Sequence, residues 1–231
     1  MKMSNKLLLG GFLTLILLVT GMHIALYAKY KNGHYTIYQP GERDGQPAMK
    51  SFPNVSVITI RNVGGANIVF GDMLAVENDE DAPVHVLQQG DSVVITGGNE
   101  DGRFAERNRV ELILPHNVTL SVFNSEITFD KGKDNPRTNP NIFLYNSHAT
   151  FAVSRTPIQL GYVMMTSDNS IAAFRGNTQV NHLEVQLKNS SLEYNEGDIG
   201  QLSIATDSAS RLMLQSKHLL KAKITTISNN P

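Results

Sequence analysis

The sequence predicts an all-β protein, a right-handed β-helix-like solenoid of short strands preceded by one N-terminal transmembrane helix. Three observations support this prediction. A polar pair flanked by alternating apolar residues returns about every twenty residues in the second half of the chain, which is how stacked repeats read in sequence. Apolar and polar residues alternate within each repeat, as expected of half-buried strands. The N-terminal region instead contains a long apolar run without charged residues.

The N-terminal region is expected to be a membrane anchor. From Leu7 to Ala28 there is no Asp, Glu, Lys or Arg, and a helix of this length covers roughly 33 Å, compared with about 30 Å for a bilayer core. Residues 1–6 would form a cytoplasmic stub, because Lys2 and Lys6 precede the apolar run. Residues 7–28 are therefore predicted to be an uncleaved signal-anchor in the lipid bilayer of the cell inner membrane, with the C-terminal domain in the periplasm or outside. A cleaved signal peptide is the alternative, although its apolar region is usually shorter, about 7–15 residues.

The composition excludes several classes of function. The chain has no cysteine, so disulfides, thiolate metal sites and a lipid-modified N-terminal cysteine are excluded. Its formal net charge is −1 and its pI is about 6.7, which gives no indication of nucleic-acid binding. The sequence contains no P-loop, nucleophile elbow or zinc-ligand spacing, and we expect no cofactor.

The chain after the anchor is predicted to contain a tether and one folded domain. Residues 29–50 are polar and rich in Gly and Pro, which is typical of a linker. The β-solenoid domain is expected at residues 51–226, followed by a short tail at residues 227–231. Its first strands are predicted at Val55–Ile60, Ala66–Gly71, residues 73–78, 83–89 and 91–98, and Arg109–Pro115. We expect Asn62–Gly65 (NVGG) to form a turn, and Gln89–Asp91 to form a hairpin-like break.

The repeats follow Pro115, and each offers one or two strands. They are Val118–Phe129, Asn141–Phe151, Val163–Phe174, Leu183–Tyr194 and Leu202–Leu214. Aromatic residues make up 7% of the chain and tryptophan is absent, so Val, Ile and Leu are expected to form the core. A β-sandwich would also give short strands at regular spacing. The polar pair at the same place in each unit favours the solenoid.

The polar pairs are predicted to form columns, because equivalent positions in stacked coils lie about 4.8 Å apart. The candidate polar ladder consists of Asn124, Ser125, Asn146, Ser147, Asn169, Ser170, Asn189, Ser190, Asp207 and Ser208. Asn and Asp tolerate left-handed backbone and bond to nearby amides, as Ser hydroxyls also do. The columns are therefore expected to be structural. A ladder that binds ligand hydroxyls is the alternative.

No catalytic or metal site emerges from the sequence. The seven histidines are scattered, and the acidic run from Glu77 to Asp81 lacks the glycine and ligand spacing of calcium loops. Enzymes built on β-helices use charged residues from neighbouring coils, so Asp168, Arg175, Lys188 and Asp207 are the candidates if such a site exists.

Taken together, the anchor, the FPNVSVITI segment, the DSVVITGG hairpin, the RVELILP strand and the Asn-Ser repeats resemble a known family. The chain resembles the auto-transporter adhesin head domain family of bacterial envelope proteins, also called the head GIN domain. The resemblance covers roughly Ser51 to Thr226. It implies an exported β-helical domain with an adhesin-type role and supplies no catalytic residues.

The leading functional hypothesis is a membrane-anchored, non-catalytic module that binds a glycan or an envelope protein through an exposed solenoid face. A polysaccharide lyase or hydrolase with a site across coils is the first alternative. A sensor of envelope stress that acts through a protein partner is the second. The end of the last unit, near Lys221 to Thr226, would be an exposed edge suited to self-association.

Overall fold

The computed structural model describes residues 49–78, 84–97, 105–130, 137–151 and 157–227, together with Phe12, Ile16, Val19, Thr20 and His23. The chain divides into two units, Met1–Gln46 and Pro47–Pro231. The five described residues of the first unit are helical and exposed, and the rest of the predicted stub, anchor and tether up to residue 48 lies outside the described residues. The described residues contain no helix that is long and apolar enough to span a bilayer, so the transmembrane helix stays a prediction.

The described part of the second unit is all β except for one short helix, α2 (Ser216–Leu219). Its strands form two nine-stranded sheets. Sheet A contains, in spatial order, β1 (Lys50–Phe52), β4 (Leu74–Asn78), β7 (Ala105–Pro115), β3 (Val63–Gly71), β9 (Glu126–Phe129), β11 (His148–Phe151), β13 (Ile171–Phe174), β15 (Ser191–Tyr194) and β17 (Arg211–Leu214). Sheet B contains β18 (Ala222–Thr226), β16 (Asp198–Thr206), β14 (Gln179–Lys188), β12 (Gln159–Asp168), β10 (Asn141–Tyr145), β8 (Thr119–Phe123), β2 (Val57–Arg61), β6 (Ser92–Thr96) and β5 (His85–Gln89).

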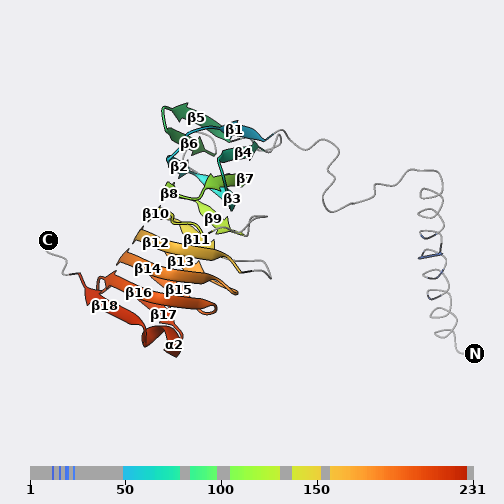
Figure 1. The fold of residues 1–231 in the computed structure, drawn as a ribbon. Helices are drawn as coiled ribbons and strands as arrows, with labels where there is room; N and C mark the ends of the chain where they lie inside the picture. Colours follow the sequence, from blue (N-terminus) through green and yellow to red (C-terminus); the bar gives the residue numbers. More distant parts are fainter. Residues whose placement is uncertain are drawn as a thin grey trace, which may run out of the picture. The chain divides into compact units, whose positions relative to one another are not determined.

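This arrangement is a β-solenoid, as the sequence predicted. From β8 onward each coil passes through one strand of sheet B, turns, and passes through one strand of sheet A, and the next coil stacks on it in parallel register. Figure 1 shows the coils following one another from the green strands to the red ones. Since each strand pairs with the equivalent strand of the next coil, equivalent residues form columns along the stack.

The first coils are not stacked in sequence order. The coil of β2 and β3 lies between the coil of β8 and β9 and the coil of β6 and β7. The chain therefore passes outward to β7 and returns to begin the regular repeats at β8. Strands β4 and β5 pair antiparallel with β7 and β6, and β1 pairs antiparallel with β4. The outermost strands at this end are thus antiparallel additions to the stack (Figure 1).

Two predicted turns in this region had different outcomes. The hairpin-like break at Gln89–Asp91 is confirmed, because β5 and β6 pair antiparallel around it and Gly90 has a positive φ of 63°. The predicted turn over Asn62–Gly65 is wrong. The chain turns at Asn62 alone, with φ 53°, and β3 begins at Val63. A single Asn in left-handed backbone is enough to redirect the chain between the two sheets.

The core fills the space between the two sheets, and each strand contributes alternate residues to it. The expectation that Val, Ile and Leu form this core is incomplete. One inner column is aromatic: Phe70, Phe129, Phe151, Phe174 and Tyr194 stack with centroid separations of 5.7, 4.4, 4.3 and 4.9 Å. Equivalent positions in successive coils bring these rings into stacked contact.

Candidate functional site

The repeated asparagines form a continuous ladder of side-chain hydrogen bonds at the turn between the sheets. Asn124 Nδ2 donates to Asn62 Oδ1 at 3.2 Å and Asn146 Nδ2 donates to Asn124 Oδ1 at 2.8 Å. Asn169 and Asn189 each extend the ladder by one bond of 3.1 Å. These residues have φ between 46° and 53°, the left-handed region that Asn tolerates. Asn62, which the repeat pattern missed because Val63 follows it in place of Ser, begins the ladder.

The serines that follow form a second, buried column. The main-chain N–H of Ser125 donates to Ser147 Oγ at 3.2 Å, and that of Ser147 donates to Ser170 Oγ at 2.9 Å. Ser170 is bonded to Ser190 in the same way, and Val63 N–H donates to Ser125 Oγ at 2.9 Å. Each hydroxyl from Ser125 to Ser190 donates to the carbonyl two residues before it. Because the hydroxyls are buried and bonded within the protein, the geometry favours a structural role for this column.

The last unit departs from the predicted columns at Asp207 and Ser208. Ser208 is exposed, and its expected place is taken by Ser210, whose Oγ accepts from Ser190 N–H at 3.1 Å. The Asp207 carboxylate accepts from Asn189 N–H at 3.0 Å and from the Ser210 hydroxyl. The hydrogen bond from Ser210 holds the pKa of Asp207 below its usual range, although burial opposes this shift. The turn is longer here, so the letters Asp-Ser do not match the Asn-Ser positions.

The four charged residues that a cross-coil enzyme site would need do not converge. Lys188 Nζ lies 3.4 Å from an Asp168 oxygen, beside the asparagine ladder. Arg175 directly follows β13, at the end of that strand away from the asparagine ladder. Its guanidinium lies 3.9 Å from the Glu193 carboxylate. Asp207 accepts hydrogen bonds from Ser210 of its own turn and from Asn189 N–H of the preceding coil. Asp168, Lys188 and Asp207 therefore lie at the same turn in successive coils, whereas Arg175 lies at another corner, so the four residues do not form one site.

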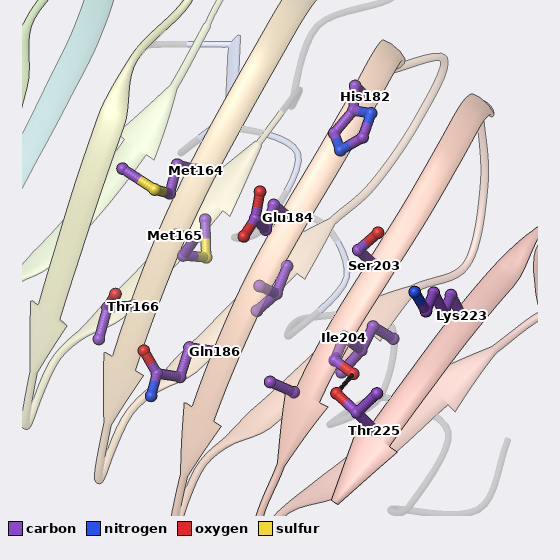
Figure 2. Close-up of a pocket in the computed structure, with 12 residues that line it drawn as sticks. Met164, Met165, Thr166, His182, Glu184, Gln186, Ser203, Ile204, Lys223 and Thr225 are labelled. Atoms are coloured by element: carbon purple, nitrogen blue, oxygen red, sulfur yellow. Dashed lines mark hydrogen bonds between the residues drawn. The ribbon is translucent and has the colours of Figure 1, made fainter. Parts of the chain in front are cut away.

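A different group of residues comes together on the outer face of sheet B. An open hollow of about 550 Å³ lies over β12, β14, β16 and β18, and Figure 2 shows its lining side chains. Two rows of residues in register cross it: Met164, Glu184, Ser203 and Lys223 in one, and Thr166, Gln186, Ala205 and Thr225 in the other. Ser203 and Ala205 are the smallest side chains of their rows, so the surface is lowest along β16.

His182 and Glu184, which line the hollow, belong to an interacting group of aromatic and polar side chains that extends beyond it to Tyr162 and Gln201. Tyr162 stacks on His182 with their ring centroids 4.9 Å apart, and the Tyr162 hydroxyl donates to the Glu184 carboxylate. His182 Nδ1 lies 2.9 Å from Gln201 Oε1. The hydrogen bond to Glu184 raises the pKa of the Tyr162 phenol above its ordinary value, so the hydroxyl stays protonated. The Tyr162 side chain is held in place while 43% of the residue surface remains exposed.

A second aromatic group lies on the same outer face, at the end of the strands. Arg61, Phe123 and Tyr145 are in register on β2, β8 and β10. The Phe123 and Tyr145 rings stack at 4.8 Å, and the Arg61 guanidinium lies 5.1 Å from the centre of the Phe123 ring. The outer face of sheet B therefore offers exposed ring surface at two places.

Sequence reasoning missed both groups. Tyr162, His182 and Gln201 lie on outward positions of neighbouring strands, and only the register of the coils shows that they touch.

The predicted acidic run, Glu77 to Asp81, is described only in part, because residues 79–83 lie outside the described residues. Glu77 belongs to β4. Among the residues that are described, no cluster of His, Asp and Glu is placed to hold a metal ion.

Comparison with known proteins does not identify a family for this chain. No protein-family model matches the chain, and no curated protein is significantly similar to it. The resemblance to the adhesin head domain family therefore stays a prediction.

Proposed function

We propose that this protein is a non-catalytic binding module of the bacterial cell envelope, and that it binds a glycan on the outer face of sheet B. The observation that carries the proposal is the hollow beneath Tyr162, His182 and Glu184, on a parallel sheet with an exposed outer face. Parallel sheets are normally covered on both faces. An outward face with exposed rings and polar groups is suited to a ligand.

The chemistry of the face fits a sugar chain better than a globular protein. A sugar ring has an apolar C–H face and hydroxyl groups around its edge. The exposed ring of Tyr162 would contact the apolar face, while Glu184, Gln186 and Thr225 can bond hydroxyls. The strands follow one another about 4.8 Å apart, so successive coils present an extended surface to an extended ligand. Anchoring through residues 7–28 would place this surface outside the cytoplasm.

The proposal is non-catalytic because the hollow does not hold the groups that glycoside hydrolysis requires. Hydrolases use two carboxyl groups on either side of the scissile bond. Among the described residues lining the hollow, Glu184 is the one carboxylate, and it accepts a hydrogen bond from Tyr162. A lyase would need a base. The raised pKa of Tyr162 disfavours a phenolate in this position, and His182, which lines the hollow, is the group that newly formed sugar ends would implicate.

The test uses the full-length chain with a panel of envelope and host polysaccharides. Retained protein and newly formed sugar ends are read from the same wells. Retention without new ends is expected, and it should weaken in Glu184→Gln but not in Glu193→Gln. Glu193 is the matched control, because it lies on sheet A and contacts Arg175.

Three results would contradict the proposal. New sugar ends would show an enzyme. Retention that is unaffected by Glu184→Gln would place the ligand elsewhere. No retention of any polysaccharide, together with co-purification of an envelope protein, would favour a protein partner.

A further inference from the structure

The end of sheet B formed by β18 is an unpaired strand edge. β18 pairs in parallel with β16 along five consecutive residues, without a bulge, and no other strand among the described residues pairs with its far side. In Figure 1 it is the outermost strand at the end opposite β1 and β5. Natural proteins usually protect such edges with prolines, bulges or inward-pointing charges. β18 carries one edge lysine, Lys223, on its outward side, but it has no proline, bulge or inward-pointing charge; its inward positions are Ala222, Ile224 and Thr226.

The free main-chain groups of β18 can be assigned from its hydrogen bonds. Ile227 N–H donates to Thr206 O at 2.8 Å, toward β16. Because alternate residues of a strand direct their main-chain groups to opposite sides, Lys223 and Thr225 also face β16. Ala222, Ile224 and Thr226 therefore present both N–H and C=O at the free edge. This edge is a template for one more strand.

Apolar side chains accompany these free groups. Leu219 is 49% exposed, Leu220 is 89% exposed and Ile224 is 45% exposed. They lie within six consecutive residues of the chain, at the end of the solenoid. A partner strand alone would satisfy the main chain, whereas a partner that also covers apolar side chains would remove this surface from water.

We propose that the occupant of this edge is β18 of a second copy of the chain, in antiparallel register about a two-fold axis at Ile224. Ile224 then faces Ile224 of the other copy, Ala222 faces Thr226, and Lys223 faces Thr225. The three residues with free main-chain groups fall opposite one another, so each pair exchanges both hydrogen bonds.

The charges of the strand fit this register. Lys223 faces a neutral threonine and not its own copy. Lys221, just before the strand, is already bonded to Asp198 at 3.0 Å and to Ile199 O at 2.7 Å. Like charges directly opposite each other would oppose pairing, and this register places none there. A two-fold contact also closes on itself and leaves this edge covered in both copies.

The absence of cysteine from the sequence makes a crosslinking test specific. In the full-length protein, Ile224→Cys would bring two thiols onto the axis, where main-chain pairing gives a Cα separation of about 5.5 Å, within the range of a disulfide. Mild oxidation should convert Ile224→Cys to a covalent dimer on a non-reducing gel. Leu87→Cys is the matched control, because Leu87 is exposed on β5 at the other edge of sheet B, and it should stay monomeric.

A second pair of variants tests the register without a new thiol. Thr225→Lys places a charge opposite Lys223 and should raise the dimer dissociation constant by about tenfold, whereas Thr225→Glu should lower it by a similar factor. A monomeric Ile224→Cys, equal behaviour of the two Thr225 variants, or disulfides between Ile224→Cys and Leu87→Cys chains would overturn the proposal. The last result would indicate head-to-tail assembly.

Discussion

The central coils and the last coil of the solenoid meet the same packing requirement in different ways. In the coil of β10 and β11, the turn consists of Asn146 and Ser147, and Phe151 lies between two other rings. In the last coil the turn extends from Asp207 to Ser210. A central coil has a neighbour on each side, so identical side chains satisfy one another. The last coil has a neighbour on one side, and its Asp207 and Ser210 side chains bond to each other as well as to Asn189 and Ser190 of the preceding coil.

The aromatic column ends in the same manner. Tyr194 replaces phenylalanine in the next-to-last coil, and its buried hydroxyl donates to Thr178 O at 3.0 Å. Burial raises the pKa of this phenol above its ordinary value. His218 of α2 then packs edge-on against Tyr194 at 4.7 Å and is fully buried. Repetition of the same residue therefore accompanies stacking against identical neighbours, and the changes at Tyr194, Asp207 and Ser210 lie near the C-terminal end of the stack.

The largest difference between the two regions is expected in the aromatic column. Phe151→Ala should lower the free energy of unfolding by about 3–5 kcal/mol, because it removes a fully buried ring between two others. Leu214→Ala, on the partly exposed last strand of sheet A, should cost about 2 kcal/mol or less. Urea unfolding followed by circular dichroism measures both. Equal losses would show that the middle and the end of the column are packed alike.

A smaller difference is expected in the serine column. Ser147→Ala removes the acceptor of Ser125 N–H in a buried place and should cost about 1–3 kcal/mol. Ser208→Ala is the matched control and should leave stability unchanged, because Ser208 is exposed outside the column. The same unfolding measurement compares them. A larger effect at Ser208 than at Ser147 would reject the assignment of Ser210 to the column.

The smallest difference concerns pH. Burial lowers the pKa of His218 below its ordinary value of 6.5, Lys217 and Lys221 lower it further, and Asp198 opposes them. Tyr194 is the other titratable group against the ring. The unfolded chain then binds the proton more readily, so stability should fall as the pH decreases below about 6.5 toward the lower pKa of the folded state.

His218→Phe should remove this loss, because phenylalanine continues the column without titrating. Melting temperatures of the wild type and the variant between pH 7 and pH 5 test the prediction. An identical pH dependence in the two proteins would contradict it.

The sequence predicted the parts of the fold that repeat. The spacing of Asn124, Asn146, Asn169 and Asn189 indicated stacked coils, because two-sided stacking requires the same residue at the same place. The sequence did not predict that the coil of β2 and β3 lies between the coil of β6 and β7 and the coil of β8 and β9. Nothing local to β2 and β3 indicates which coil will cover them. It also missed Ser210. The repeat was recognised from a serine directly after the Asn or Asp, whereas the longer last turn places its column serine at Ser210.

The candidate binding face was beyond sequence reasoning for a related reason. Tyr162, His182 and Glu184 follow no motif, and they meet through the register of β12 with β14. Outward residues of a solenoid are free to vary from coil to coil, so they carry no period. Only the pairing of strands brings them together.

We propose that the asparagine ladder holds the coils together, whereas the outer face of sheet B binds the ligand. The most direct measurement titrates the best-retained polysaccharide against the wild type, Tyr162→Ala and Asn146→Ala, below the melting temperature of all three. Tyr162→Ala should lose about tenfold or more in affinity at an unchanged melting temperature. Asn146→Ala should have a lower melting temperature than the wild type and an unchanged affinity for the polysaccharide. Loss of binding in Asn146→Ala with retention in Tyr162→Ala would contradict the account and make the ladder the ligand site.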